Sequence, residues 1–136
     1  MSQKRIRHIT DKVSEYPPGH WSNCLSVGDF IWVSGFTSRA ADLKTILGKG
    51  SAYEQTKVIF QKVKDCLENA DSCMADVVNI TIYVTRMEDN KGVWQARQEF
   101  FEGDFPCSTL VQVAGLADPD ILVEITSQAV RGSGKT

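Results

Sequence analysis

The residues best suited to chemistry lie in two apolar segments near the C-terminus. Cys107 and Ser108 directly follow Pro106 and open one segment, and Glu124 lies between two apolar residues in the next. A carboxylate in such a strand needs hydrogen-bond partners or carries a raised pKa. Glu124 would either activate water or bind a ligand amine, or else make a structural contact to backbone amides or a neighbouring subunit. The sequence alone leaves both interpretations open.

A thiol or hydroxyl nucleophile is the first alternative at this segment. Cys107 would need a base, and nothing in the spacing makes His20 that base. The strand alternation also places Cys107 on the face opposite Ser108, so we expect a small packed residue there. A Ser-His-Asp triad built on Ser108 lacks a suitable histidine.

The composition is that of an ordinary globular domain. The 136 residues are 42% hydrophobic and 24% charged, with a formal net charge of -2, and the short basic head near Lys4 is interpreted as a solvated terminus. We expect one domain over residues 1–136, large enough to bury about two thirds of the surface that its unfolded chain exposes. Nucleic acid is not expected as a partner, because a dedicated binder usually carries a basic excess.

Neither a membrane nor a metal is expected as a partner. The sequence has no run of about 18 apolar residues, and its first ten residues lack the apolar core of a secretory signal. We therefore expect a cytoplasmic protein with reduced thiols and without a cofactor. No zinc-binding spacing connects its cysteines and histidines, which are Cys24, Cys66, Cys73, Cys107, His8 and His20.

Sequence periodicities predict five strands and two helices. A turn at Gly28-Asp29 predicts a hairpin over residues 22–35, followed by a long, mobile loop over 36–50. Ser51 with Glu54 three residues later matches a capping box at a helix start. The remaining elements are a strand over 76–86, a helix over 89–102 and strands over 107–114 and 121–130. The order β-β-α-β-α-β-β predicts an α+β fold whose mixed sheet has both helices on one face.

The same periodicities predict which residues are buried. The inner side of the second helix is predicted to include Trp94 and Arg97, and Cys66 belongs to the apolar stripe of the first helix, where it would be buried and inert. The second face of the sheet is left uncovered. We interpret it as a subunit interface with embedded polar sites, carrying Thr81, Tyr83, Ser108, Gln112, Glu124, Thr126 and Gln128.

Five segments together resemble the YjgF/Rid family, the reactive intermediate deaminases that are also labelled L-PSP endoribonucleases. The segments are GHWSNCLSVGDFIWVSG, the EQT that opens the first helix, ADVVNITIYVTRMED, FPCSTLVQVAGL and ILVEITSQAV, in the family's order and spacing. The resemblance covers essentially the whole chain. It implies a chorismate-mutase-like α+β fold assembled as a homotrimer, in which the sheets line a central barrel and three ligand clefts lie between subunits.

The resemblance also implies catalytic roles. Family members that deaminate enamines and imines grip the substrate carboxylate with an arginine two residues after a proline; Pro106 matches the proline, and Ser108 stands at the arginine position. A serine offers one donor and no charge, so it cannot replace a bidentate guanidinium. Glu124 falls on the glutamate that holds the attacking water. The chain is thus identified as an Arg-less member, with Glu124 and Ser108 at its catalytic positions.

Ligand contacts follow from the same resemblance. The matching positions are Ser34 and Gly35, whose backbone lines the cleft, Trp21, where many members have a tyrosine, and Cys107, which is usually a small residue. Trp21 would stack on a planar ligand or anchor its Pro-rich loop. Trp94 and Arg97 lie one turn apart on a helix that neighbours the cleft, and both are expected to contact the ligand. Arg97 is the best candidate for a surrogate cation, and Arg39 is the other.

We therefore expect a protein that binds a small planar enamine- or imine-type metabolite at the subunit clefts, with hydrolytic deamination if another cation replaces the arginine. Without one, little deamination of 2-aminoacrylate is expected, and Ser108→Arg would restore it. A non-catalytic small-molecule binder or trimeric interaction protein is the alternative. An L-PSP-type endoribonuclease is disfavoured because the chain is acidic and has no basic stripe.

Overall fold

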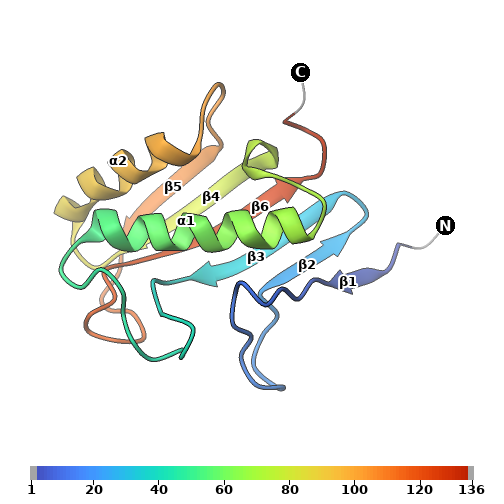
Figure 1. The fold of residues 1–136 in the computed structure, drawn as a ribbon. Helices are drawn as coiled ribbons and strands as arrows, with labels where there is room; N and C mark the ends of the chain where they lie inside the picture. Colours follow the sequence, from blue (N-terminus) through green and yellow to red (C-terminus); the bar gives the residue numbers. More distant parts are fainter. Residues whose placement is uncertain (1–2, 135–136) are drawn as a thin grey trace.

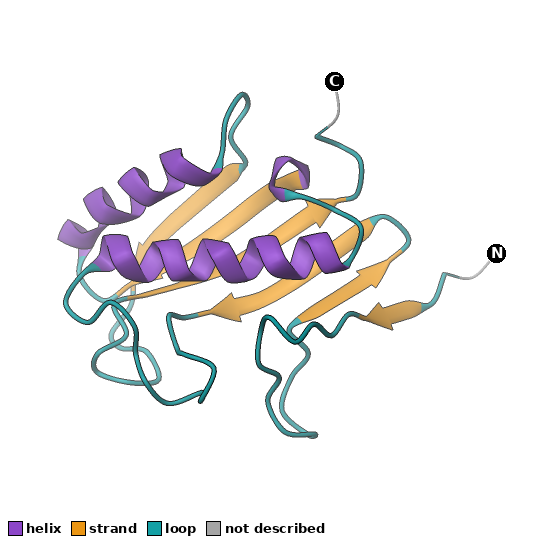
Figure 2. Cartoon of the chain, viewed as in Figure 1, coloured by secondary structure: helices purple, strands orange, loops and turns teal. Residues whose placement is uncertain are grey.

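A computed structural model describes residues 3–134 as a six-stranded sheet with two helices on one face (Figure 1). Figure 2 shows these two layers, and neither helix is long and apolar enough to cross a membrane. The elements are β1 (Arg5–Arg7), β2 (Cys24–Val27), β3 (Phe30–Phe36), α1 (Ala52–Asn69), β4 (Val77–Val84), α2 (Asn90–Phe100), β5 (Cys107–Gln112) and β6 (Val123–Val130), with short 3-10 turns at Met74–Asp76 and Met87–Asp89. The predicted α+β class is confirmed.

The sheet is mixed, as predicted, in the order β1-β2-β3-β6-β4-β5. β4 and β5 are parallel and are joined through α2, whereas every other neighbouring pair is antiparallel. Because β6 is the last strand and enters between β3 and β4, it brings the C-terminal residues beside the Val-Ser-Gly end of the first hairpin. This insertion positions Glu124 next to Gly35.

The core lies between the helices and the sheet. α1 starts at the predicted cap, where the Ser51 hydroxyl oxygen accepts a hydrogen bond from the Glu54 amide at 3.1 Å. Its apolar stripe, including Phe60 and Val63, is fully buried against the strands. Cys66 is buried in this stripe as predicted, and burial raises the pKa of its thiol to about 12, so it remains an uncharged thiol at neutral pH.

The N-terminal residues form a strand that the sequence did not predict. Arg5–Arg7 are exposed, as expected for a solvated terminus, and form the edge strand β1, antiparallel to β2. Arg7 also makes an ion pair with Glu15 at 2.6 Å. Charged side chains on an edge strand discourage pairing with another sheet, which fits the position of β1.

The loop after β3 is long, as predicted, but it is held by its own contacts and is not a free segment. Arg39 and Ile46 form an isolated antiparallel bridge, and the Asp42 carboxylate accepts two backbone hydrogen bonds within the intervening turn. Ser38 and Ile46 are buried. These contacts tie parts of the loop to the fold, whereas Asp42, Lys44 and Leu47 are exposed. The mobility of the loop stays a prediction.

The pairing of β4 with its neighbours exposes Val78 and corrects the predicted faces of Ser108 and Gln112. The register of β4 shifts between Val77 and Asn79, so Val77 enters the core and Val78 is 40% exposed. Ser108 lies opposite Ile80 of β4, whose side chain is in the core. Ser108 therefore points to the helix side, as does Gln112, which is on the same face of β5. Neither belongs to the uncovered face on which they were predicted.

Candidate functional site

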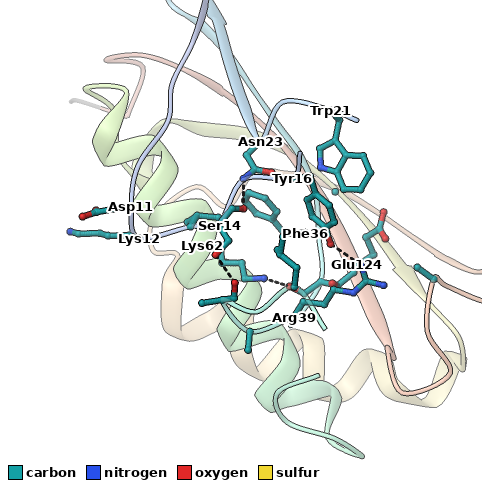
Figure 3. Close-up of a pocket in the computed structure, with 17 residues that line it drawn as sticks. Asp11, Lys12, Ser14, Tyr16, Trp21, Asn23, Phe36, Arg39, Lys62 and Glu124 are labelled. Carbon is teal, nitrogen blue, oxygen red and sulfur yellow. Dashed lines mark hydrogen bonds between the residues drawn. The ribbon is translucent and has the colours of Figure 1, made fainter. Parts of the chain in front are cut away.

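A pocket of about 160 Å³ opens where the end of β3 meets the start of β6 (Figure 3). Three loops border it, one before β2, one after β3 and one before β6, and Lys62 of α1 also lines it. The side chains that matter to its chemistry are Tyr16, Trp21, Arg39, Lys62 and Glu124, and Gly35 also lines it. We call this site the β6 pocket. It brings together three residues expected at the cleft, Trp21, Gly35 and Glu124, and also Arg39, the second candidate for a surrogate cation.

Glu124 occupies the space that a side chain at Gly35 would fill. A Cβ added to Gly35 would lie 3.1 Å from Glu124 Cδ and 3.3 Å from Cγ, and closer still to Oε2. Within residues 3–134, neither carboxyl oxygen of Glu124 accepts a hydrogen bond. Partial burial raises the pKa of the Glu124 carboxyl, and the charge of Arg39 opposes this rise. A carboxyl with a raised pKa is suited to both accepting and releasing a proton.

Arg39 places a positive charge in the same pocket. Its Nη1 donates a hydrogen bond to the Tyr16 hydroxyl oxygen at 2.7 Å. Its Nε is buried and has no hydrogen-bond partner among residues 3–134. Arg39 also makes no ion pair within this range. A buried N–H without a partner costs free energy, so the guanidinium is ready to bind a polar or anionic group.

Lys62 reaches the pocket from α1. Its Nζ donates to the Thr37 carbonyl oxygen at 2.7 Å and lies 5.8 Å from the centre of the Phe36 ring. Burial lowers the pKa of this amine to about 8, with a further contribution from the charge of Arg39. The pocket therefore holds a carboxyl and an amine whose pKa values are shifted toward each other.

Aromatic and hydroxyl groups complete the pocket wall. Trp21 is 47% exposed and packs on Tyr16 with ring centroids 4.3 Å apart, so one of its faces stays accessible to a planar ligand. The Ser34 hydroxyl donates to the Ser22 carbonyl oxygen at 2.5 Å, and its side chain therefore fixes the loop before β2. The expected contact of the Ser34 backbone with a ligand stays a prediction.

A second group of predicted residues lies around β5. Arg97 of α2 donates from Nη1 to the Ser108 hydroxyl oxygen at 3.1 Å. Partial burial lowers the pKa of the Arg97 guanidinium, and no carboxylate pairs with it among residues 3–134. We call Trp94, Arg97 and Ser108 the edge cluster. It carries an unpaired cation beside the strand position where the family resemblance places an arginine.

Two predictions about burial fail at this edge. Trp94 is 46% exposed, although it was predicted on the inner side of its helix. It follows the buried Val93, and one residue turns a helix by about 100°, which carries the indole away from the core. Cys107 was expected to be packed but is exposed, because it faces away from the helices on an edge strand.

One chain does not bring the β6 pocket and the edge cluster together. Glu124 pairs with Tyr83 on the face away from the helices, whereas Ser108 shares the helix side with Ile80. β4 also separates β6 from β5. The predicted catalytic pair, Glu124 and Ser108, thus lies on opposite faces of the sheet. Residues 3–134 also contain no group of three or more side chains arranged to hold a metal ion.

Sequence reasoning missed Tyr16 and Lys62. Lys62 carried a signal, since it lies three residues after the buried Ile59 and four before Cys66, at the flank of the helix stripe. A lysine there must bury part of its stem. Tyr16 gave no such signal, because its position depends on how the loop before β2 folds back over β3.

Residues 12–131 match the family described as Endoribonuclease L-PSP. The chain belongs to this family. Among relatives, a RutC family protein of Pyrococcus abyssi is 31% identical over 123 residues, which cover 90% of this chain and 94% of the relative. A 2-iminobutanoate/2-iminopropanoate deaminase of Dermatophagoides farinae is 29% identical over 133 residues, which cover 96% of this chain and 98% of the relative.

The L-PSP family, or YjgF/Rid family, also accounts for the fold. A crystal structure of a protein of unknown function from Pseudomonas aeruginosa matches with a TM-score of 0.85 and 36% identity, covering 96% of this chain and 94% of the other. The implied chorismate-mutase-like α+β fold is confirmed. The family match includes the β6 pocket and the edge cluster, whereas β1 lies before its first residue.

Proposed function

We propose that this L-PSP family member binds a small planar imine- or enamine-type metabolite and hydrolyses it to ammonia and a carbonyl compound. The observation that carries the proposal is Glu124, a partly buried carboxyl with a raised pKa that opens into the β6 pocket beside Gly35. The relative named as an iminobutanoate and iminopropanoate deaminase supports the reaction class.

In this proposal Glu124 moves protons between water and the substrate nitrogen. Ionised Glu124 accepts a proton from water as the water oxygen bonds to the imine carbon, and passes that proton to the imine nitrogen. The same carboxylate then transfers the new hydroxyl proton to the nitrogen as the C–N bond breaks. A carbonyl group and ammonia remain. A carboxyl whose pKa lies above its ordinary value is better matched to these transfers near neutral pH.

Arg97 is the proposed cation for a substrate carboxylate. A guanidinium binds a carboxylate through two parallel hydrogen bonds, which a serine cannot make. Arg97 reaches Ser108 at 3.1 Å and has no acidic partner in residues 3–134, so a guanidinium from α2 stands beside the position that lacks one on β5. This contact changes the expectation of weak activity, because a surrogate cation is within reach.

We further propose that the two groups of residues meet between subunits of a homotrimer, each subunit being one domain of residues 1–136. The separation of Glu124 and Ser108 across the sheet supports this, since one chain alone would leave the site incomplete. Phe30 and Trp32 are 57% and 43% exposed on the uncovered face of β3. A neighbouring copy would remove this apolar surface from water.

Hydrolysis of 2-iminopropanoate, generated in situ, tests the proposal through the rate of pyruvate formation. We expect Glu124→Gln and Arg97→Gln each to reduce the acceleration by about 100-fold. Glu88→Gln is the matched control, because the Glu88 side chain is 73% exposed and lies outside both groups. Wild-type activity in Glu124→Gln would refute the mechanism, and wild-type activity in Arg97→Gln would remove Arg97 from it. A monomer in light scattering would refute the shared site.

A non-catalytic binder is the second candidate, favoured by the serine at position 108. In that case 2-iminopropanoate is not converted faster than in buffer, whereas a small planar carboxylate raises the midpoint of thermal unfolding. Ser108→Arg then separates the two functions. A gain of hydrolysis in this variant would mean that the wild-type protein lacks only the arginine that binds the substrate carboxylate.

A further inference from the structure

Lys62 is a second reactive group in the β6 pocket, and the proposed hydrolysis does not use it. Lys62 lies on α1, with buried residues before and after it along the helix. Its Nζ donates a hydrogen bond of 2.7 Å to the Thr37 carbonyl oxygen, which orients the amine. In Figure 3 Lys62 points into the pocket that Arg39 and Glu124 also line. An amine that lines the same pocket as a cation and a carboxyl is an arrangement suited to covalent chemistry.

The amine of Lys62 is more often uncharged than that of an exposed lysine. Burial, and then the charge of Arg39, lower its pKa to about 8, and only a smaller effect of Cys66 opposes them. On the same helix, hydrogen bonds raise the pKa of Lys57 and of Lys64. A neutral Lys62 can still donate one N–H to the Thr37 carbonyl while its lone pair points elsewhere. Lys62 is thus set apart from its neighbours as a nucleophile.

We propose that Lys62 condenses reversibly with small 2-oxo acids that enter the β6 pocket. The nitrogen lone pair bonds to the ketone carbon and gives a carbinolamine. The carbinolamine then loses its hydroxyl group and a nitrogen proton as water, leaving an imine, with no oxidation or reduction. Glu124 donates the proton that the departing hydroxyl needs and takes up the nitrogen proton. Addition of water reverses the steps and releases the acid.

Arg39 determines the class of carbonyl compound. Its Nε is buried without a hydrogen-bond partner in residues 3–134, and its Nη1 is bonded only to the neutral Tyr16 hydroxyl. A carboxylate next to the ketone would satisfy these donors, since hydrogen bonds between charged groups are about twice as strong as neutral ones. The pocket of about 160 Å³ is also small beside the roughly 300–1,000 Å³ of pockets for drug-sized ligands, which favours short acids.

This inference goes beyond the proposed imine hydrolysis, because it needs only the pocket of one chain and neither the edge cluster nor a trimer. The two are connected by chemistry: hydrolysis of a 2-imino acid leaves a 2-oxo acid. Lys62 would then retain the product and slow its release. If the hydrolysis assay fails, the condensation at Lys62 can still be tested separately.

Trapping with pyruvate tests the inference directly. The protein is incubated with pyruvate and sodium cyanoborohydride, which reduces imines in preference to ketones, and is then analysed by intact mass and peptide mapping. We expect one saturable adduct, equal in mass to pyruvic acid less one oxygen, on Lys62. Labelling should rise with pH with a midpoint of about 8, following the pKa of Lys62.

Three variants make the outcome decisive. Lys62→Gln, which keeps a donor for the Thr37 carbonyl, should lose the adduct, whereas Lys64→Gln should retain it. Arg39→Gln should raise the pyruvate concentration for half-maximal labelling by about tenfold or more relative to that of butanone, which has no carboxylate and responds only to the change in the Lys62 pKa. An adduct on the exposed Lys12 at the pocket rim, or labelling spread over surface lysines, would overturn the proposal. The wild-type peptide map decides this even if Lys62→Gln fails to fold.

Discussion

Replacing Gly35 with alanine tests whether the position of Glu124 determines the chemistry of the β6 pocket. The added Cβ would lie 3.1 Å from Glu124 Cδ and nearer to Oε2, whereas ordinary contacts of this kind begin at 3.4 Å. Relief of this overpacking requires the carboxyl end to move by on the order of 1 Å. A displacement of that size at a catalytic group lowers a rate by about 100-fold.

The cost of this change in stability is expected to be small. Gly35 does not have a positive φ, so alanine adds no backbone strain, and the clash falls on the end of a side chain that can rotate. Overpacking of a rigid core costs about 1–3 kcal/mol. Because Glu124 can rotate, we expect the free energy of unfolding of Gly35→Ala to fall by about 1 kcal/mol or less in urea denaturation.

The assay combines imine hydrolysis with a titration of Glu124 by carbon-13 NMR. Gly115→Ala is the matched control, since nothing lies within 4 Å of the Cβ that it adds and Gly115 has no positive φ. We expect Gly35→Ala to lose about 100-fold in rate and to shift the pKa of Glu124, and the control to do neither. An unchanged rate together with an unchanged Glu124 pKa in Gly35→Ala would refute the reasoning. If the protein binds the ligand without hydrolysing it, the titration of Glu124 still tests the prediction.

Two further predictions concern charge. Arg39→Met should raise the pKa of Glu124 further, because Arg39 opposes the effect of burial, and an unchanged NMR titration would contradict this. At Asp76 burial raises the pKa, but hydrogen bonds from Ser72 and from backbone amides outweigh it and lower the pKa overall. Folded Asp76 therefore binds fewer protons than the unfolded chain, so its contribution is present above pH ~3.9 and is lost as pH falls through the folded value. Asp76→Asn should lower the free energy of unfolding by about 1–3 kcal/mol. It should also reduce the loss of this free energy toward acid pH, measured by urea denaturation at several pH values, and an unchanged loss would count against the prediction.

Local patterns were sufficient for most of the fold. The Gly28-Asp29 turn and the cap at Ser51 are local signals that tertiary contacts did not override. β1 was missed because three residues are too short to show an alternation, so its pairing with β2 determines its structure. Val78 is exposed because a bulge shifts the alternation of β4 by one residue, and a bulge has no sequence pattern of its own here.

The family resemblance named Glu124 and Gly35 as site residues, but it did not predict their contact. The two residues lie in different segments, and they meet only because β6 enters the sheet beside β3, which strand periodicity does not determine. Lys62 was missed because a lysine in a helix is usually interpreted as a solvent-exposed residue. Its pKa depends on Arg39, which comes from a loop whose bridge to Ile46 forms only in the folded chain.

We propose that Ser108 takes part in carboxylate binding indirectly, through its contact with Arg97. A carboxylate clamp requires a guanidinium at a point in space, and the strand that usually supplies it is only one of the elements near that point. α2 lies beside β5, and Arg97 donates to the hydroxyl oxygen of Ser108, at the position where the family resemblance implies an arginine. In the function that we propose, this hydroxyl orients the guanidinium, and the guanidinium binds the carboxylate. Removing the hydroxyl alone, by Ser108→Ala, would then weaken carboxylate binding while leaving Arg97 in place.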